Sequence, residues 1–131
     1  MKQKRIALYD PLWRANIGIV IGPSNAEMVT NWFQHHGIEY PIRGGAFDGR
    51  TATLDAGLNI YIFLAPDLPL AEFYATLAHE AFHAAHMILS NRGQPNEDQD
   101  GEESHAYFIS WIVRSVTNAM NPVTPAKKRK R

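Results

Sequence analysis

Short runs in which apolar and polar residues alternate predict β-strands in the first half of the chain. Two such runs cover residues 5–9 and 17–21. In the second run Ile17, Ile19 and Ile21 fall on one face, which predicts a strand that packs on a core from that side.

A helix is predicted after the second strand. Ser24 stands three residues before Glu27, which is typical of a capping box at a helix N-terminus. Apolar residues then recur at helical spacing until Gly37, where we expect the helix to close.

Two further strands are predicted at residues 51–55 and 58–64, joined by a turn at residues 55–57. The second strand has an aliphatic face that is expected to point toward the core, formed by Leu58, Ile60, Ile62 and Leu64. Its other face is unusually aromatic for one exposed to water, and it is formed by Asn59, Tyr61 and Phe63.

The second half of the chain predicts two helices. The first has Asp67 as its expected N-cap and Pro69 in its first turn, and its nearly all-round apolar surface to about Ser90 predicts a central position. The second is expected from Glu102 to about Asn118.

These elements predict one α+β domain over residues 1–121, with a small mixed or antiparallel sheet packed on a central helix and a second, C-terminal helix. A chain of 131 residues is long enough for one such core and too short for two ordinary domains. Residues 122–131 are predicted to be a basic, disordered tail.

Composition narrows the function classes. Apolar residues make up 45% and charged residues 20%, as in soluble globular proteins, and neither a membrane span nor a signal peptide is apparent, so a cytoplasmic protein is expected. With no cysteine, any metal must be held by His, Asp or Glu. The tail ends in five basic residues, Lys127, Lys128, Arg129, Lys130 and Arg131, for which a solvated terminus is favoured over a nucleic-acid tether or an import signal.

The central helix carries His79, Glu80 and His83 in the pattern HExxH. Residues four apart on a helix project only about 40° apart from neighbouring turns, so the two imidazoles can face one point. A shared metal ion is the natural occupant of that point, and Glu80 then lies in position to take a proton from a metal-bound water. The pattern therefore predicts one zinc ion per chain with a catalytic base beside it.

The alternative is that His79 and His83 are hydrogen-bonded core histidines, because HExxH also occurs by chance. Three features favour zinc: the helix is central, an aromatic-faced strand precedes it, and the helix that follows opens with carboxylates.

Catalytic zinc usually takes three protein ligands. The candidates for the third are Glu102, Glu103, His105 and His86. Glu103 fits best because it opens the polar stripe of the last helix, whereas His105 lies about 200° around that helix and cannot face the same ion. His86 lies roughly 10 Å along the helix axis from His79. Glu102 has an alternative role as a favourable charge at a helix N-terminus.

The sequence HEAFHAA at residues 79–85, followed about twenty residues later by EESHAY, resembles gluzincin-type zinc metallopeptidases. More narrowly, it resembles the small metallopeptidases of phage and prophage genomes, and the resemblance covers roughly residues 58–116. It implies that His79, His83 and Glu103 bind zinc, that Glu80 is the general base and that Tyr107 lies beside the site.

The resemblance also implies a zincin-like α+β fold, in which an edge strand before the active-site helix binds extended peptide by strand addition. Residues 58–64 occupy that place, so Asn59, Tyr61 and Phe63 are expected to line the substrate cleft. For a phage protein, the expected location is the host cytoplasm.

Larger gluzincins have a C-terminal subdomain that stabilises the oxyanion, and this chain is expected to lack one. The residues that remain open for that role are Tyr107, His86 and the glycine-rich segment 44–49 with Arg50.

Three functions are compatible with these patterns. The first is a zinc-dependent metallopeptidase that hydrolyses peptide bonds of a peptide or protein substrate. The second is a non-catalytic, zinc-stabilised binding or inhibitory module, for example in phage–host interaction. The third is a nucleic-acid-associated accessory protein that uses residues 127–131.

Overall fold

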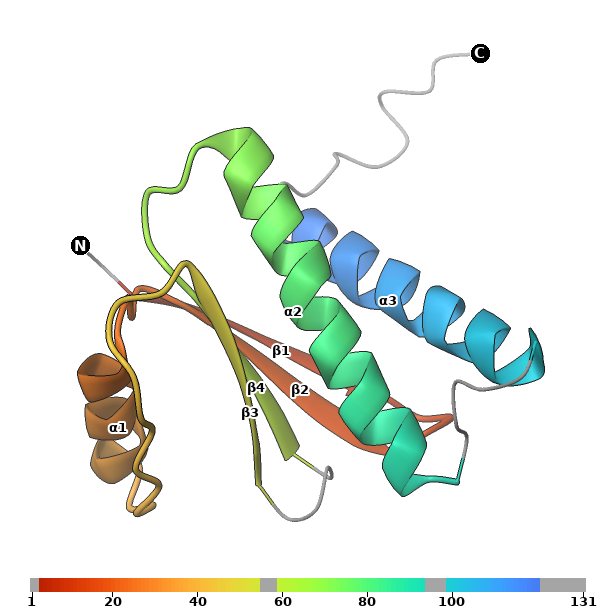
Figure 1. Cartoon of the computed structure of the whole chain (residues 1–131), viewed down its shortest axis with the longest axis horizontal. Coiled ribbons are helices and arrows are strands. Elements are labelled where there is room, and N and C mark those ends of the chain that lie inside the picture. The colour runs from red at the N-terminus through yellow and green to blue at the C-terminus, as the bar shows by residue number, and fades with distance from the viewer. Residues whose placement is uncertain (1–2, 55–58, 94–98, 121–131) are drawn as a thin grey trace.

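In a computed structural model of the chain, residues 3–54, 59–93 and 99–120 are described, and they form an α+β fold (Figure 1). One four-stranded mixed sheet carries helices on both faces. In chain order the elements are β1 (Lys4–Asp10), β2 (Ala15–Ile21), α1 (Ala26–His35), β3 (Gly49–Leu54), β4 (Asn59–Leu64), α2 (Leu70–Asn91) and α3 (Gln99–Met120). Every predicted strand and helix is present, with ends that differ by a few residues.

The sheet has the strand order β1-β2-β4-β3. β1 pairs antiparallel with β2, and β3 pairs antiparallel with β4. β2 and β4 pair in parallel, with Asn16 opposite Asn59 and Ile21 opposite Leu64. The prediction that residues 58–64 form an edge strand is therefore wrong, because β4 is an inner strand and the edge beside it is β3.

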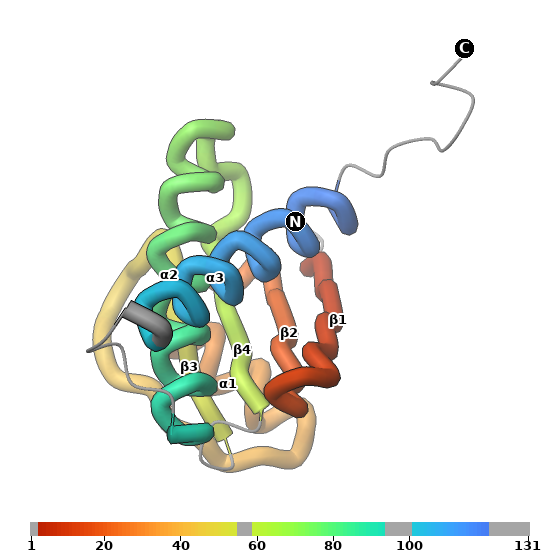
Figure 2. Tube along the Cα trace, turned by 90° about the vertical axis from the view of Figure 1, so that its right-hand side faces the viewer, coloured from red at the N-terminus to blue at the C-terminus, as the bar shows by residue number. Residues whose placement is uncertain are grey.

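The two faces of the sheet bury separate cores. The alternation predicted for the strand at residues 58–64 is confirmed for its described part: Ile60, Ile62 and Leu64 pack on the side of α2 and α3. Phe63 and, less deeply, Tyr61 pack on the side of α1. Figure 2 shows α2 and α3 side by side over one face, with α1 behind the sheet.

α1 begins one residue later than predicted. Asn25 is its N-cap, and the Asn25 side-chain oxygen accepts a hydrogen bond from the backbone N–H of Met28 at 2.9 Å. Ser24, the predicted cap, directs its hydroxyl to the Met28 sulfur instead. Since Asn and Ser cap helices about equally well, the pattern did not distinguish these neighbours. The helix ends before Gly37 as predicted, and Gly37 has the positive φ, 76°, that glycine tolerates.

α2 begins at Leu70, after Pro69 in the N-cap position, with no side chain bonded to its first turn. The prediction that Asp67 caps this helix is wrong, because Asp67 lies in the preceding turn in the left-handed conformation with a φ of 60°. α3 begins at Gln99, before the predicted Glu102.

The predicted turn at residues 55–57 and the predicted basic tail at residues 122–131 lie outside the described residues, and so does the nucleic-acid prediction attached to that tail. Among the helices that the structure describes, none is long and apolar enough to cross a membrane.

Candidate metal centre

His79 and His83 project from α2 on its solvent-facing side. The stripe of α2 that packs on the sheet includes Phe73, Leu77, Ala81, Ala84 and Ile88, which leaves the two histidines on the opposite side of the helix. The His79 side chain is 68% exposed. The interpretation of these two residues as buried core histidines is therefore wrong.

The two imidazoles point toward each other. Their Nε2 atoms are 3.2 Å apart, and their ring centres are 4.9 Å apart. Two nitrogens that each lie about 2.0–2.1 Å from one tetrahedral zinc ion are separated by about 3.3 Å. The spacing of the His79 and His83 nitrogens therefore fits a shared zinc ion without a change of backbone.

Glu80 has a different environment from its histidine neighbour. It is only 6% exposed, and its side chain points toward β3. The Thr51 hydroxyl donates a hydrogen bond to Glu80 Oε1 at 2.7 Å, and it also lies 3.1 Å from the Glu80 carbonyl oxygen. The second carboxylate oxygen, Oε2, lies 3.9 Å from His79 Nε2. One oxygen is thus held by the sheet while the other lies near His79, which is compatible with the role of a general base.

Gly49 permits this close approach of β3 to α2. A Cβ atom at this position would lie 2.5 Å from Thr76 Cγ2 and 2.9 Å from Glu80 Cγ, so a larger residue would push the strand and the helix apart. The sequence indicated Gly49 only as part of the glycine-rich segment 44–49, a candidate for oxyanion stabilisation, and it indicated no role for Thr51. A sequence signal for both roles exists, because Gly49 and Thr51 are two residues apart and therefore lie on the same face of a strand.

The predicted third ligand, Glu103, is exposed on α3. Among the described side chains of residues 3–54, 59–93 and 101–120, no three His, Asp or Glu side chains gather closely enough to hold a metal. His105, which contacts His86 of α2, marks the side of α3 that faces α2. Glu102 lies about 60° from His105 around the helix, whereas Glu103 lies on nearly the opposite side. The assignment of Glu103 as third ligand stays a prediction.

Tyr107 does not lie beside the histidine pair as expected. It is 74% exposed and lines a hollow of about 440 Å³ with Asp10 at the end of β1 and with Leu12 and Trp13 of the β1–β2 turn. No described residue of α2 lines that hollow. The expectation failed because α3 turns this part of its polar stripe toward β1.

The other candidates for oxyanion stabilisation have described partners of their own. The Arg50 guanidinium donates to the Arg43 carbonyl at 2.9 Å and lies over the Phe47 ring. The His86 ring stacks on Phe82 at 6.1 Å between centres.

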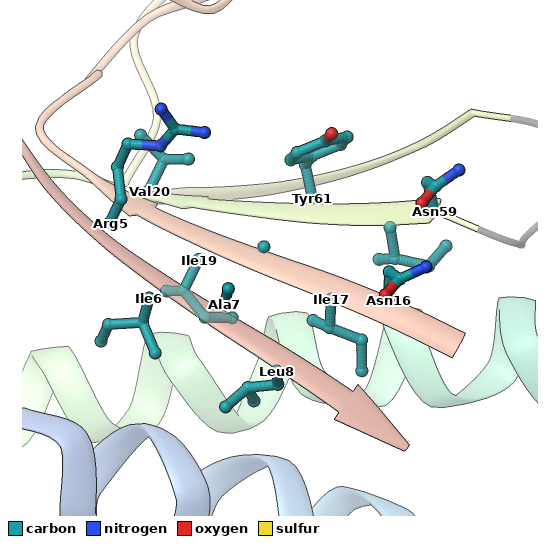
Figure 3. A pocket seen from close by; sticks show the side chains of 12 residues that line it. Arg5, Ile6, Ala7, Leu8, Asn16, Ile17, Ile19, Val20, Asn59 and Tyr61 are labelled. Atoms are coloured by element: carbon teal, nitrogen blue, oxygen red, sulfur yellow. The ribbon is translucent and has the colours of Figure 1, made fainter. Parts of the chain in front are cut away.

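The three residues expected to line the substrate cleft lie on the other face of the sheet. Phe63 is fully buried against Trp32 and Phe33 of α1. Asn59 and Tyr61 line a hollow of about 470 Å³ over β1, β2 and β4. In Figure 3 both point away from the helices at the lower edge of the view. They cannot line a cleft at His79, because the sheet separates them from α2.

No protein-family model, curated protein or solved structure matches this chain. The case for a metal centre therefore rests on the residues themselves, and chiefly on the geometry of His79, Glu80 and His83.

Proposed function

We propose that this protein is a zinc-dependent metallopeptidase that hydrolyses peptide bonds. His79 and His83 supply two zinc ligands, Glu103 supplies the third, and Glu80 is the general base. One observation carries the proposal: two exposed imidazole nitrogens converge within 3.2 Å beside a buried carboxylate that a strand residue, Thr51, holds in place. Converging imidazoles with an adjacent carboxylate base are the donor set of a hydrolytic zinc site.

Zinc at this position would polarise the scissile carbonyl and lower the pKa of a water molecule toward about 7. Glu80 accepts the proton of that water through Oε2, the oxygen nearer His79, and transfers it to the leaving amine. Thr51 holds Oε1, so the carboxylate keeps one orientation during both transfers. A base fixed in this way loses less conformational freedom on reaching the transition state.

β3 is the proposed binding edge for an extended peptide. It is an edge strand of the described sheet, and such an edge presents backbone N–H and C=O groups to which another strand can pair. Since Gly49 and Thr51 of β3 contact Glu80, a peptide paired along β3 would pass the proposed base. The zincin-like arrangement is part of this proposal, with β3 in the role that the sequence predicted for residues 58–64.

Glu80→Gln tests the mechanism. The amide keeps the size of the side chain and the acceptor for Thr51 but cannot accept the proton, so we expect the zinc ion held by His79 and His83 to be retained. Cleavage of a mixed peptide library, measured by mass spectrometry, should fall by about 10²- to 10⁴-fold, the usual contribution of a general base. Glu72→Gln, an exposed change in the first turn of the same helix, is the matched control and should leave cleavage unchanged.

Full cleavage by Glu80→Gln would overturn the mechanism. A wild-type protein that binds zinc and gains thermal stability from it, but cuts no peptide, would instead be a zinc-stabilised binding module. The third ligand is decided by metal content: Glu103→Ala should bind one zinc ion fewer than the wild type, and Glu102→Ala should bind as many as the wild type. The reverse result would move the ligand to Glu102.

A further inference from the structure

A buried histidine on α3 has a free ring nitrogen. His105 is only 3% exposed, and its Nδ1 lies 2.8 Å from the carbonyl oxygen of Gly101. Its Nε2 is buried without a hydrogen-bond partner in the described structure. A buried polar atom without a partner is costly, so this nitrogen calls for an additional ligand.

The hydrogen bond to Gly101 determines which nitrogen carries the proton. A carbonyl oxygen only accepts, so Nδ1 of His105 must be the N–H donor. In a neutral imidazole, Nε2 then has an unprotonated lone pair. A ring fixed by an Nδ1–H bond to a carbonyl, with a free Nε2, is the state in which histidine binds transition metals.

His86 of α2 lies next to this nitrogen-bearing ring. The centres of the His86 and His105 rings are 5.8 Å apart, with 43° between their planes. Metal–nitrogen bonds of about 2.0–2.1 Å place the centres of two imidazoles that share one ion about 5–6 Å apart. His86 is exposed, so its ring can turn toward the ion and water can complete the coordination.

We propose that His86 and His105 bind a second divalent transition metal, such as Zn²⁺ or Ni²⁺, at a site separate from His79 and His83. The described ring contacts join His79 to His83 and His86 to His105, and Phe82 lies against both His83 and His86. Imidazole nitrogens favour this class of metal. The second site does not depend on the peptidase function.

A metal at this second site links α2 to α3. His86 lies in the C-terminal half of α2 and His105 near the start of α3, so one ion would bridge two helices that follow each other in the chain. A ligand that binds only the folded state raises stability with its concentration. The bridge would also fix the part of α3 that carries Glu102 and Glu103.

Zinc stoichiometry of the full chain separates the two sites. After removal of metal with a chelator, titration calorimetry with Zn²⁺ should give two equivalents for wild type, one for His86→Ala, one for His83→Ala and none for the double variant. His86 is exposed, so its replacement is compatible with folding. His35→Ala, an exposed histidine of α1, is the matched control and should still bind two.

A single equivalent in wild type, or two in His86→Ala, would overturn the second site. A wild-type chain that binds two zinc equivalents but cleaves no peptide would overturn only the proposed function. ¹⁵N spectra of the imidazoles give an independent readout, in which His105 should be protonated on Nδ1 and its Nε2 signal should shift with Zn²⁺ in His83→Ala. No shift in that variant, or protonation on Nε2, would contradict the proposal.

Discussion

The two faces of the sheet use the same alternation of side chains for different purposes. On the face toward α2, β4 contributes aliphatic side chains, and the helix contributes the fully buried Ala81, Ala84 and Ala85. Alanines let the helix lie close to the sheet, and Glu80 of the same helix reaches the Thr51 hydroxyl. Small side chains on this face therefore allow the polar contacts of the candidate metal centre.

The face toward α1 is built from rings. Trp32 and Phe33 of α1 meet Tyr61 and Phe63 of β4 with ring centres 5.2 to 5.6 Å apart, mostly edge to face. Aromatic side chains bury a large area each, so a helix of ten residues suffices to cover this core. The comparison teaches that large side chains fill the face toward α1, whereas small side chains leave room for polar groups on the face that holds the candidate metal centre.

The largest expected effect belongs to the α2 face. His83→Ala removes one of the two converging nitrogens, so zinc affinity at this centre should fall by more than the roughly 10- to 100-fold that loss of an outer partner costs. Cleavage should be lost with it, whereas the free energy of unfolding of the metal-free protein should hardly change because His83 is exposed. Calorimetry with Zn²⁺ measures the zinc affinity, and urea unfolding measures the free energy of unfolding. Strong destabilisation of the metal-free variant would show that His83 contributes to the fold and would contradict the prediction.

The opposite pattern is expected on the α1 face. Phe63 is fully buried, so Phe63→Ala should lower the free energy of unfolding by about 3–5 kcal/mol. Zinc stoichiometry in the fraction that folds should not change. Tyr9→Ala, which removes an aromatic ring that is 53% exposed, should change stability by no more than about 0.5 kcal/mol. Equal effects of the two changes would mean that this ring cluster does not hold the face together.

Thr51→Val tests the hydrogen bond that joins the sheet to the candidate base, Glu80. It keeps the shape of the side chain but removes the donor to Glu80, and a hydrogen bond to a carboxylate contributes about 1.5–3 kcal/mol. We expect lower stability and a lower kcat with little change in KM, because the Thr51 side chain positions Glu80, whereas pairing of a peptide with β3 would use the backbone, which the substitution keeps. Thr51→Ser restores the hydroxyl and should recover most of kcat, whereas a serine variant as slow as the valine variant would exclude positioning through the hydroxyl.

Gly49→Ala tests the close approach of β3 to α2. The added methyl would overlap Thr76 Cγ2, and overpacking of this kind costs about 1–3 kcal/mol. Thr76→Ser removes the methyl that is nearest, so the double variant should recover part of the loss. Gly45→Ala, where a Cβ meets nothing within 4 Å, is the control and should be nearly neutral in urea unfolding.

Local sequence patterns predicted the helices and strands and the pair of histidines in the candidate metal centre. The i, i+4 spacing of His79 and His83 determines their convergence once the helix exists, and the alternation along β4 determines which residues share a face. Strand order did not follow from these patterns, because the pairing of β2 with β4 joins distant parts of the chain. Tyr61 and Phe63 were expected at a cleft but pack against α1, because α1 covers the face of β4 that is opposite α2.

Residue positions that depend on how the helices pack could not be predicted from the sequence either. Glu103 and Tyr107 share a stripe of α3, but the direction of that stripe depends on how α3 rests on α2 and on the sheet. Turn conformation could not be predicted either. Asp67 is a residue type that is favoured at helix N-caps, but its backbone has the left-handed conformation of a turn residue. These features depend on contacts between elements, which periodicity does not encode.

The parallel pairing of β2 with β4 also bears on how the chain folds. β1 with β2, and β3 with β4, are pairs of consecutive strands that can form early, whereas Asn16 must find Asn59 across the whole intervening segment. Non-local pairing is slow because the entropy of closing the loop is lost before the contacts form. In pulse-labelling hydrogen exchange, amides between β2 and β4 should gain protection after those within each pair. The central seam of the sheet would then be the last part to form, and the cooperativity of the whole domain would depend on it.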